Sequence, residues 1–170
     1  THPATADLCG VMLQDTAHIM AQDAEYLNRH RRNHEPPVEP LYSADDAQAV
    51  DDHWQTLQYH TSFSVIPGVT ATFYYAGHII GSVIVHLRIQ EGDREIKLVF
   101  TGDLGRKNIP ILRDPEIPDS ADILVMESTY GNRTHPDPTA LSGELAETVG
   151  RVTNRGGCIV IPAFSVARTQ

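Results

Sequence analysis

The sequence predicts a mixed α/β protein, and three observations support this class. Helical patterns fill the first part of the chain, and β-rich runs follow from about residue 56. A strand–helix–strand order then returns after residue 121. With 170 residues, 41% of them hydrophobic, the chain can bury the core of one domain or slightly more.

Charge and hydropathy narrow the function class. A net charge of −9 argues against a protein that coats nucleic acid with a basic face, but it does not argue against a cleft in which divalent metal supplies positive charge. No stretch is long and apolar enough for a membrane span, and the N-terminus lacks a signal pattern. We therefore expect a soluble, cytoplasmic protein without a membrane partner.

The first third of the chain is expected to be helical. We expect a short helix over residues 3–13 and a longer one that Asp15 opens as its cap. Residues 34–40 contain three prolines and predict a loop. Ser43 and Asp46 then have the form of a capping box, which predicts a helix that ends near Trp54.

The middle of the chain predicts strands with tight turns between them. Residues 91–94 (Glu-Gly-Asp-Arg) predict a reversal, so the strands on either side should pair as a hairpin. His86 lies among apolar neighbours there and is interpreted as a core or edge histidine. The expected strands are residues 56–60, 69–75, 82–89, 95–100 and 121–126, of which the last should be covered on both faces.

The last third predicts a helix between two strands. Residues 139–153 are amphipathic, and glycines at 156 and 157 should end that helix. Residues 158–163 predict another buried strand, and residues 164–168 should enter a further helix. Because strands joined by a helix are usually parallel, we expect a parallel βαβ unit here.

Three polar residues follow the ends of predicted strands beside glycines: His78, Asp103 and Glu127. Imidazole and carboxylate groups on stiff turns are what a metal that activates water requires. A structural reading stays open at this point, since Asp103 and Glu127 could each cap a loop through local hydrogen bonds. Predicted pairing of the neighbouring strands would bring the His78 and Asp103 turns close together.

Four sequence motifs, taken together and in their order along the chain, identify a protein family more specifically than any one of them does. They are residues 76–82 (Ala-Gly-His-Ile-Ile-Gly-Ser), 100–106 (Phe-Thr-Gly-Asp-Leu-Gly-Arg), 127–131 (Glu-Ser-Thr-Tyr-Gly) with His135 beyond, and 161–168 (Ile-Pro-Ala-Phe-Ser-Val-Ala-Arg). Together they resemble the metallo-β-lactamase-fold nucleases that carry a β-CASP domain. That family includes the RNA-cleaving subunit of pre-mRNA 3′-end processing and ribonucleases of bacteria and archaea.

The resemblance implies part of an αββα sandwich over residues 1–132 and the start of a β-CASP α/β domain over 133–170. It also implies a hydrolase that cleaves RNA with two zinc ions. His78 would ligate one metal and Asp103 would bridge both. Glu127 would be catalytic by orienting a later histidine, while Ser165 and Arg168 would lie near the RNA backbone.

One family signature, His-x-His-x-Asp-His, does not occur among the nine histidines. We therefore expect this chain to be an internal fragment with an incomplete ligand set, inactive by itself. A non-catalytic scaffold that partners an active nuclease, or a small-molecule hydrolase of the same fold, is the alternative. Removal of the first strands would leave sheet edges bare, which predicts a homodimer.

Overall fold

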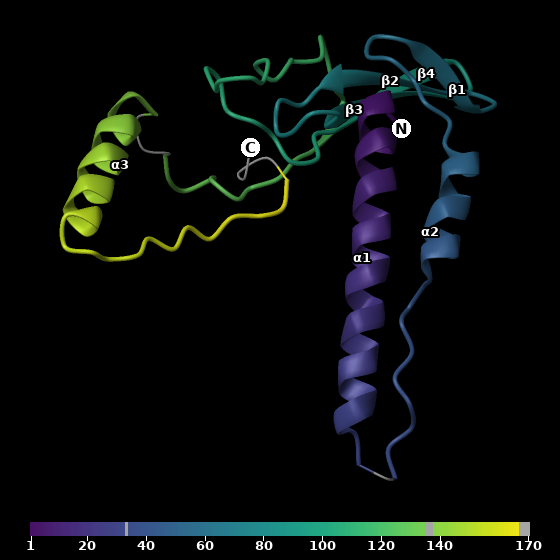
Figure 1. Ribbon diagram of the computed structural model, residues 1–170. Coiled ribbons are helices and arrows are strands. Elements are labelled where there is room, and N and C mark those ends of the chain that lie inside the picture. Colours follow the sequence, from purple (N-terminus) through teal and green to yellow (C-terminus); the bar gives the residue numbers. More distant parts are fainter. Residues whose placement is uncertain (33, 135–137, 167–170) are drawn as a thin grey trace. The chain divides into compact units, whose positions relative to one another are not determined.

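The computed structural model describes residues 1–32, 34–134 and 138–166. Contacts divide the chain into two compact units, Thr1–Glu127 and Ser128–Gln170. The mixed α/β class is confirmed, while the assignment of residues 1–132 and 133–170 to two domains stays a prediction. The elements are α1 Pro3–His30, α2 Ala44–Ala49, the 3₁₀ helix η1 Val50–His53, β1 Ser62–Ile66, β2 Val69–Tyr75, β3 Val83–Glu91, β4 Arg94–Phe100, β5 Ile123–Val125 and α3 Pro138–Thr153 (Figure 1).

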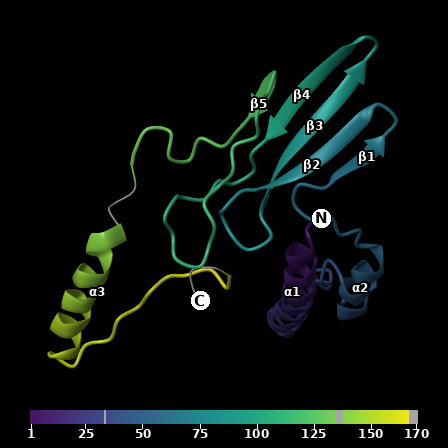
Figure 2. The same cartoon turned by 90° about the horizontal axis from the view of Figure 1, so that it is seen from above.

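The first unit contains a five-stranded sheet in the order β1-β2-β3-β4-β5, which Figure 2 shows from above. The first four strands are antiparallel neighbours, and β5 pairs with β4 in parallel. Glu91 lies opposite Arg94, so the predicted β3–β4 hairpin is confirmed. A turn at residues 67–68 joins β1 to β2, and Gly68 adopts a φ of 82° there.

The helices α1 and α2 lie side by side in the first unit (Figure 1). The predicted break at Asp15 is wrong, because α1 is one continuous helix. No glycine or proline separates residues 13 and 15, and the exposed Asp15 side chain leaves the helical hydrogen bonds intact. The capping box before α2 is confirmed: Asp46 N donates to Ser43 Oγ (3.1 Å), and Ser43 N donates to Asp46 Oδ2 (2.8 Å).

Two predicted strands do not form. Residues 56–60 are irregular, because His60 takes a φ of 60° and its N–H donates to Phe73 O (2.8 Å), so the first strand begins later. Residues 158–163 are not a strand either, since no strand of the described residues pairs with them. The predicted βαβ unit is therefore wrong for the described chain, although its helix α3 and the glycine stop at Gly156 are confirmed.

The strand β5 also differs from its prediction. Its residues Ile123, Leu124 and Val125 are 51%, 54% and 48% exposed, so it is not covered on both faces. β5 lies at an edge of the sheet and pairs with β4 alone among the described elements. None of the helices in the described part of the chain combines the length and the apolar character that a bilayer span requires.

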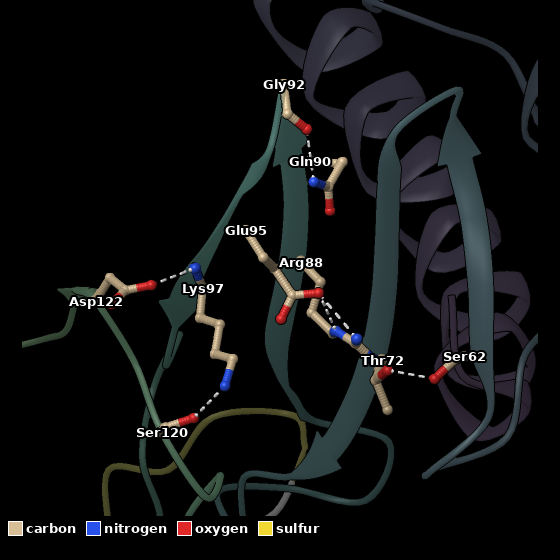
Figure 3. Close-up of polar contacts among 9 residues, drawn as sticks. All are labelled: Ser62, Thr72, Arg88, Gln90, Gly92, Glu95, Lys97, Ser120 and Asp122. Carbon is tan, nitrogen blue, oxygen red and sulfur yellow. Dashed lines mark hydrogen bonds and ion pairs between the residues drawn. The ribbon is translucent and has the colours of Figure 1, made fainter.

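His86 is a core histidine, as predicted, with 8% of its surface exposed. Its Nε2 has no hydrogen-bond partner in the described part of the chain. Two cations lie nearby in the sheet: Arg88, two residues along β3, and Lys97, opposite Arg88 on β4. Arg88 is paired with Glu95 (2.8 Å), and Lys97 Nζ donates to Ser120 Oγ (3.0 Å), as Figure 3 shows. Burial, and then the charges of Lys97 and Arg88, lower the pKa of His86.

We predict that this histidine destabilises the fold in mild acid. Because the pKa of His86 is lower in the folded chain, the unfolded chain binds the proton more readily as the pH falls below about 6.5. The urea midpoint of the wild-type chain should then fall between pH 7 and pH 5 more steeply than that of a His86→Phe variant. A His53→Gln variant, changed at an exposed histidine, should keep the wild-type slope. Equal slopes for all three proteins would refute the prediction.

Candidate functional site

The turn that carries His78 follows β2 directly. Gly77 and Gly81 adopt φ values of 70° and 88°, which side chains disfavour, so glycine is required by this backbone. Ser82 Oγ accepts from His78 N (3.2 Å) and Ile79 N (3.3 Å) and donates to Ile79 O (2.8 Å). The turn is therefore held by bonds within itself, and the His78 imidazole projects from a fixed backbone.

The turn that carries Asp103 follows β4. Gly102 has a φ of 56°, and Leu104 packs against the buried cluster of Ala76, Ile84 and Val99. Leu104 thus fixes its neighbour Asp103 by burying an apolar side chain at the end of the sheet.

These two turns touch through their backbones. Gly105 N donates to Ala76 O (2.9 Å), which joins the second turn to the residue before Gly77. A Cβ built on Gly105 would overlap the carbonyl oxygen of Gly77, so this close approach excludes any side chain at position 105. The predicted proximity of the two turns is confirmed.

The side chains of the two turns also meet. His78 Nε2 lies 3.7 Å from Asp103 Oδ2, and the two side chains are 46% and 75% exposed. Two ligands of one tetrahedral zinc ion are separated by about 3.4 Å, given metal–ligand distances near 2.1 Å. This pair therefore fits two ligands of a single ion, with the solvent side open to water and substrate.

The pair does not amount to a complete metal centre. No group of three or more histidine, cysteine, aspartate or glutamate side chains that could hold a metal occurs within residues 1–32, 34–134 and 138–166.

Glu127 lies at the end of the first unit, two residues after β5. Its Oε1 accepts a hydrogen bond of 2.6 Å from Leu104 N, so it holds the residue next to Asp103. The sequence did not predict this contact, since the resemblance implied a histidine as the partner of Glu127. Whether it also orients a histidine stays a prediction.

The two predicted RNA-contacting residues lie in the second unit. Ser165 is exposed, in a bend over residues 165–166. Arg168 and the motif residue His135 lie outside the described residues. The proposed roles of Ser165 and Arg168 therefore stay predictions.

A second polar cluster beside the His78 turn was missed by the sequence analysis. His60 Nε2 lies 2.8 Å from Glu116 Oε2, and the same oxygen accepts from Tyr75 N at 2.8 Å. His60 ends the expected strand of residues 56–60, and Glu116 lies between two prolines, Pro115 and Pro118, in the segment between the expected strands of residues 95–100 and 121–126. No local pattern signals a contact between residues so far apart in sequence.

No family model matches the chain. The chain is 32% identical over 133 residues to the endoribonuclease YSH1 of Eremothecium gossypii, which covers 78% of this chain and 17% of that protein. It is 36% identical over 175 residues to the transcription termination factor FttA of Thermococcus kodakarensis (100% and 24%). It is also 32% identical over 132 residues to a ribonuclease of Thermus thermophilus (78% and 30%).

These relatives confirm the family that the four motifs suggested. The chain belongs to the metallo-β-lactamase-fold, β-CASP family of RNA nucleases, and its sheet is part of that fold. It spans between 17% and 30% of the length of these three relatives.

Proposed function

We propose that the whole protein that contains this chain is a metal-dependent hydrolase that cleaves phosphodiester bonds in RNA. The observation that carries the proposal is the His78–Asp103 pair, held 3.7 Å apart on two interlocked turns. The names of the relatives, endoribonuclease and ribonuclease, support RNA as the substrate. The exposure of the two side chains, 46% and 75%, supports reaction with a large substrate.

We propose zinc as the metal, with two ions in the complete site. His78 and Asp103 would hold it through an imidazole nitrogen and a carboxylate oxygen, which are common zinc ligands. Bound zinc supplies Lewis-acid chemistry, which activates water near neutral pH and neutralises phosphate charge. The locked turns keep the two ligands at a fixed separation, so little reorganisation is needed when the metal arrives.

The other predicted residues take supporting roles in this proposal. Glu127 holds the Asp103 turn through Leu104 N and is proposed to orient a catalytic histidine elsewhere in the protein. Ser165 and Arg168 are proposed to contact the RNA backbone, since a hydroxyl and a guanidinium both suit phosphate oxygens. A cytoplasmic location remains part of the same proposal.

The first test is the metal content of a protein of the relatives' length that contains this chain. After exhaustive dialysis, elemental analysis should find about two zinc ions per chain. RNA cleavage by that protein should stop with a chelator and return with added zinc. If that protein folds but contains no zinc, the nuclease proposal is refuted and the non-catalytic scaffold is favoured.

We also propose that this chain forms a homodimer through a sheet edge. In the described sheet, β1 is an edge strand, and Val65 and Ile66 on it are 51% and 60% exposed. Unpaired backbone groups on such a strand can pair with a second copy. Light scattering on the purified chain should give twice the monomer mass, and a Val65→Lys variant should be monomeric. A monomeric wild-type chain would contradict the proposal.

A further inference from the structure

The loop between β4 and β5 closes on the strand that leads to His78. Asn108 N donates to Asp114 Oδ1 (2.7 Å), which ties the two sides of the loop together. Glu116 N then donates to Tyr75 O (2.9 Å), while Glu116 Oε2 accepts from Tyr75 N (2.8 Å). Glu116 therefore binds both backbone polar groups of Tyr75, the last residue of β2.

The same carboxylate oxygen reaches a third segment. His60 Nε2 lies 2.8 Å from Glu116 Oε2, and His60 N donates to Phe73 O (2.8 Å). His60 takes a φ of 60° in that position, which is uncommon for a residue with a side chain. The carboxylate of Glu116 thus joins its own loop to the end of β2 and to the segment before β1.

The loop also contacts the His78 turn itself. A Cβ built on Gly77 would lie 2.9 Å from Arg113 O and 3.0 Å from Pro115, so the loop backbone packs directly on Gly77. In addition, Arg113 N donates to Tyr75 Oη (3.3 Å). Both Gly105 and this loop therefore pack against the backbone of the His78 turn.

We propose that Glu116 is a positioning residue that fixes the location of the His78 imidazole by clamping Tyr75 through the loop of residues 107–116. The inference rests on the proposed function in one respect, namely that His78 is a metal ligand. Its physical basis is that β2 ends at Tyr75. The next three residues have no strand partner, so their position depends on the backbone groups that flank them.

The charge state of Glu116 suits this role. Burial acts to raise its pKa, but the hydrogen bonds from Tyr75 N and His60 and the positive charges of His60 and Arg113 outweigh burial and lower the pKa. The carboxylate is therefore ionised at neutral pH and accepts both bonds. The phenol of Tyr59 also lies within electrostatic range of it.

The proposal is tested by amide hydrogen exchange in this chain, measured by NMR without metal. In a Glu116→Gln variant, the N–H groups of Tyr75 and Gly105 should exchange roughly tenfold faster, because a charge-assisted bond is lost beside them. The N–H of Gln90, which donates to Gly68 O at the other end of the sheet, should be unchanged. A Glu95→Gln variant, which loses a carboxylate paired with Arg88 instead, should leave the Tyr75 and Gly105 rates unaltered.

The pattern of rates separates positioning from general stability. If Glu116 only stabilised the whole unit, the Gln90 N–H would accelerate with the other two, and that outcome would overturn the proposal. Unchanged rates at all three amides would also overturn it. Should Glu116→Gln fail to fold, His60→Gln removes one bond to the same carboxylate and should give the same local pattern with a smaller acceleration.

A second measurement, the affinity for zinc, tests whether the contacts of Glu116 affect the proposed metal ligand His78. In the zinc-loaded protein of the relatives' length, Glu116→Gln should weaken zinc binding by about tenfold while Glu95→Gln does not. If that protein holds no zinc at all, the proposed function fails, but the exchange result stands by itself. If the variant protein binds zinc with unchanged affinity, the proposed positioning of His78 by Glu116 is refuted, whatever the exchange pattern.

Discussion

The substitution Gly105→Ala is expected to destabilise the first unit by about 3 kcal/mol or more. The added Cβ overlaps the carbonyl oxygen of Gly77, and both overlapping groups are fixed to backbone rather than to a flexible side chain. The bond from Gly105 N to Ala76 O would have to break for the two turns to separate. Urea denaturation followed by the fluorescence of Trp54, the single tryptophan, measures this loss.

The matched control is Gly10→Ala, in the interior of α1 in the same unit. A Cβ there meets Asp51 Oδ1 at 3.6 Å, an ordinary contact, so the change should stabilise the helix by about 0.5–1 kcal/mol. The two variants make the same chemical change, and their opposite signs would isolate the close approach of the turns. Similar midpoints for both variants would show that the turns are not locked together.

The parts of the site that the sequence could predict are those set by local patterns. The reversal at residues 91–94 fixes the β3–β4 hairpin, and the hairpin brings the glycine turns at its open end together. His78 and Asp103 were therefore found because each follows a strand that local residues define. The interlock at Gly105 was not predictable, since it depends on how closely two backbones approach.

The parts that the sequence could not predict depend on distant partners. Glu116 binds Tyr75, 41 residues away, and His60, 56 residues away, and neither contact leaves a local pattern. The failed strand at residues 158–163 has the same cause, because apolar β-rich residues form a strand only where another strand pairs with them. Among the described residues no strand does so.

Asp103→Asn should abolish the activity of the whole protein while leaving its fold intact. In the protein of the relatives' length, we expect RNA cleavage to fall by more than about 100-fold and zinc content to drop, because the amide is a far weaker zinc ligand than the carboxylate. With 75% of its side chain exposed, Asp103 contributes little packing, so stability should change by less than about 0.5 kcal/mol. A loss of activity without a loss of stability is the signature of a ligand rather than of a turn residue.

The control for this variant is Asp93→Asn, which makes the same change at an exposed residue of the β3–β4 turn, at the other end of β4. It should keep both zinc and cleavage. If Asp103→Asn instead lowers stability strongly and leaves the zinc content of the folded fraction unchanged, Asp103 serves the turn and not the metal. His78 would then lose its partner ligand in the described chain, and the scaffold reading of the protein would become the better one.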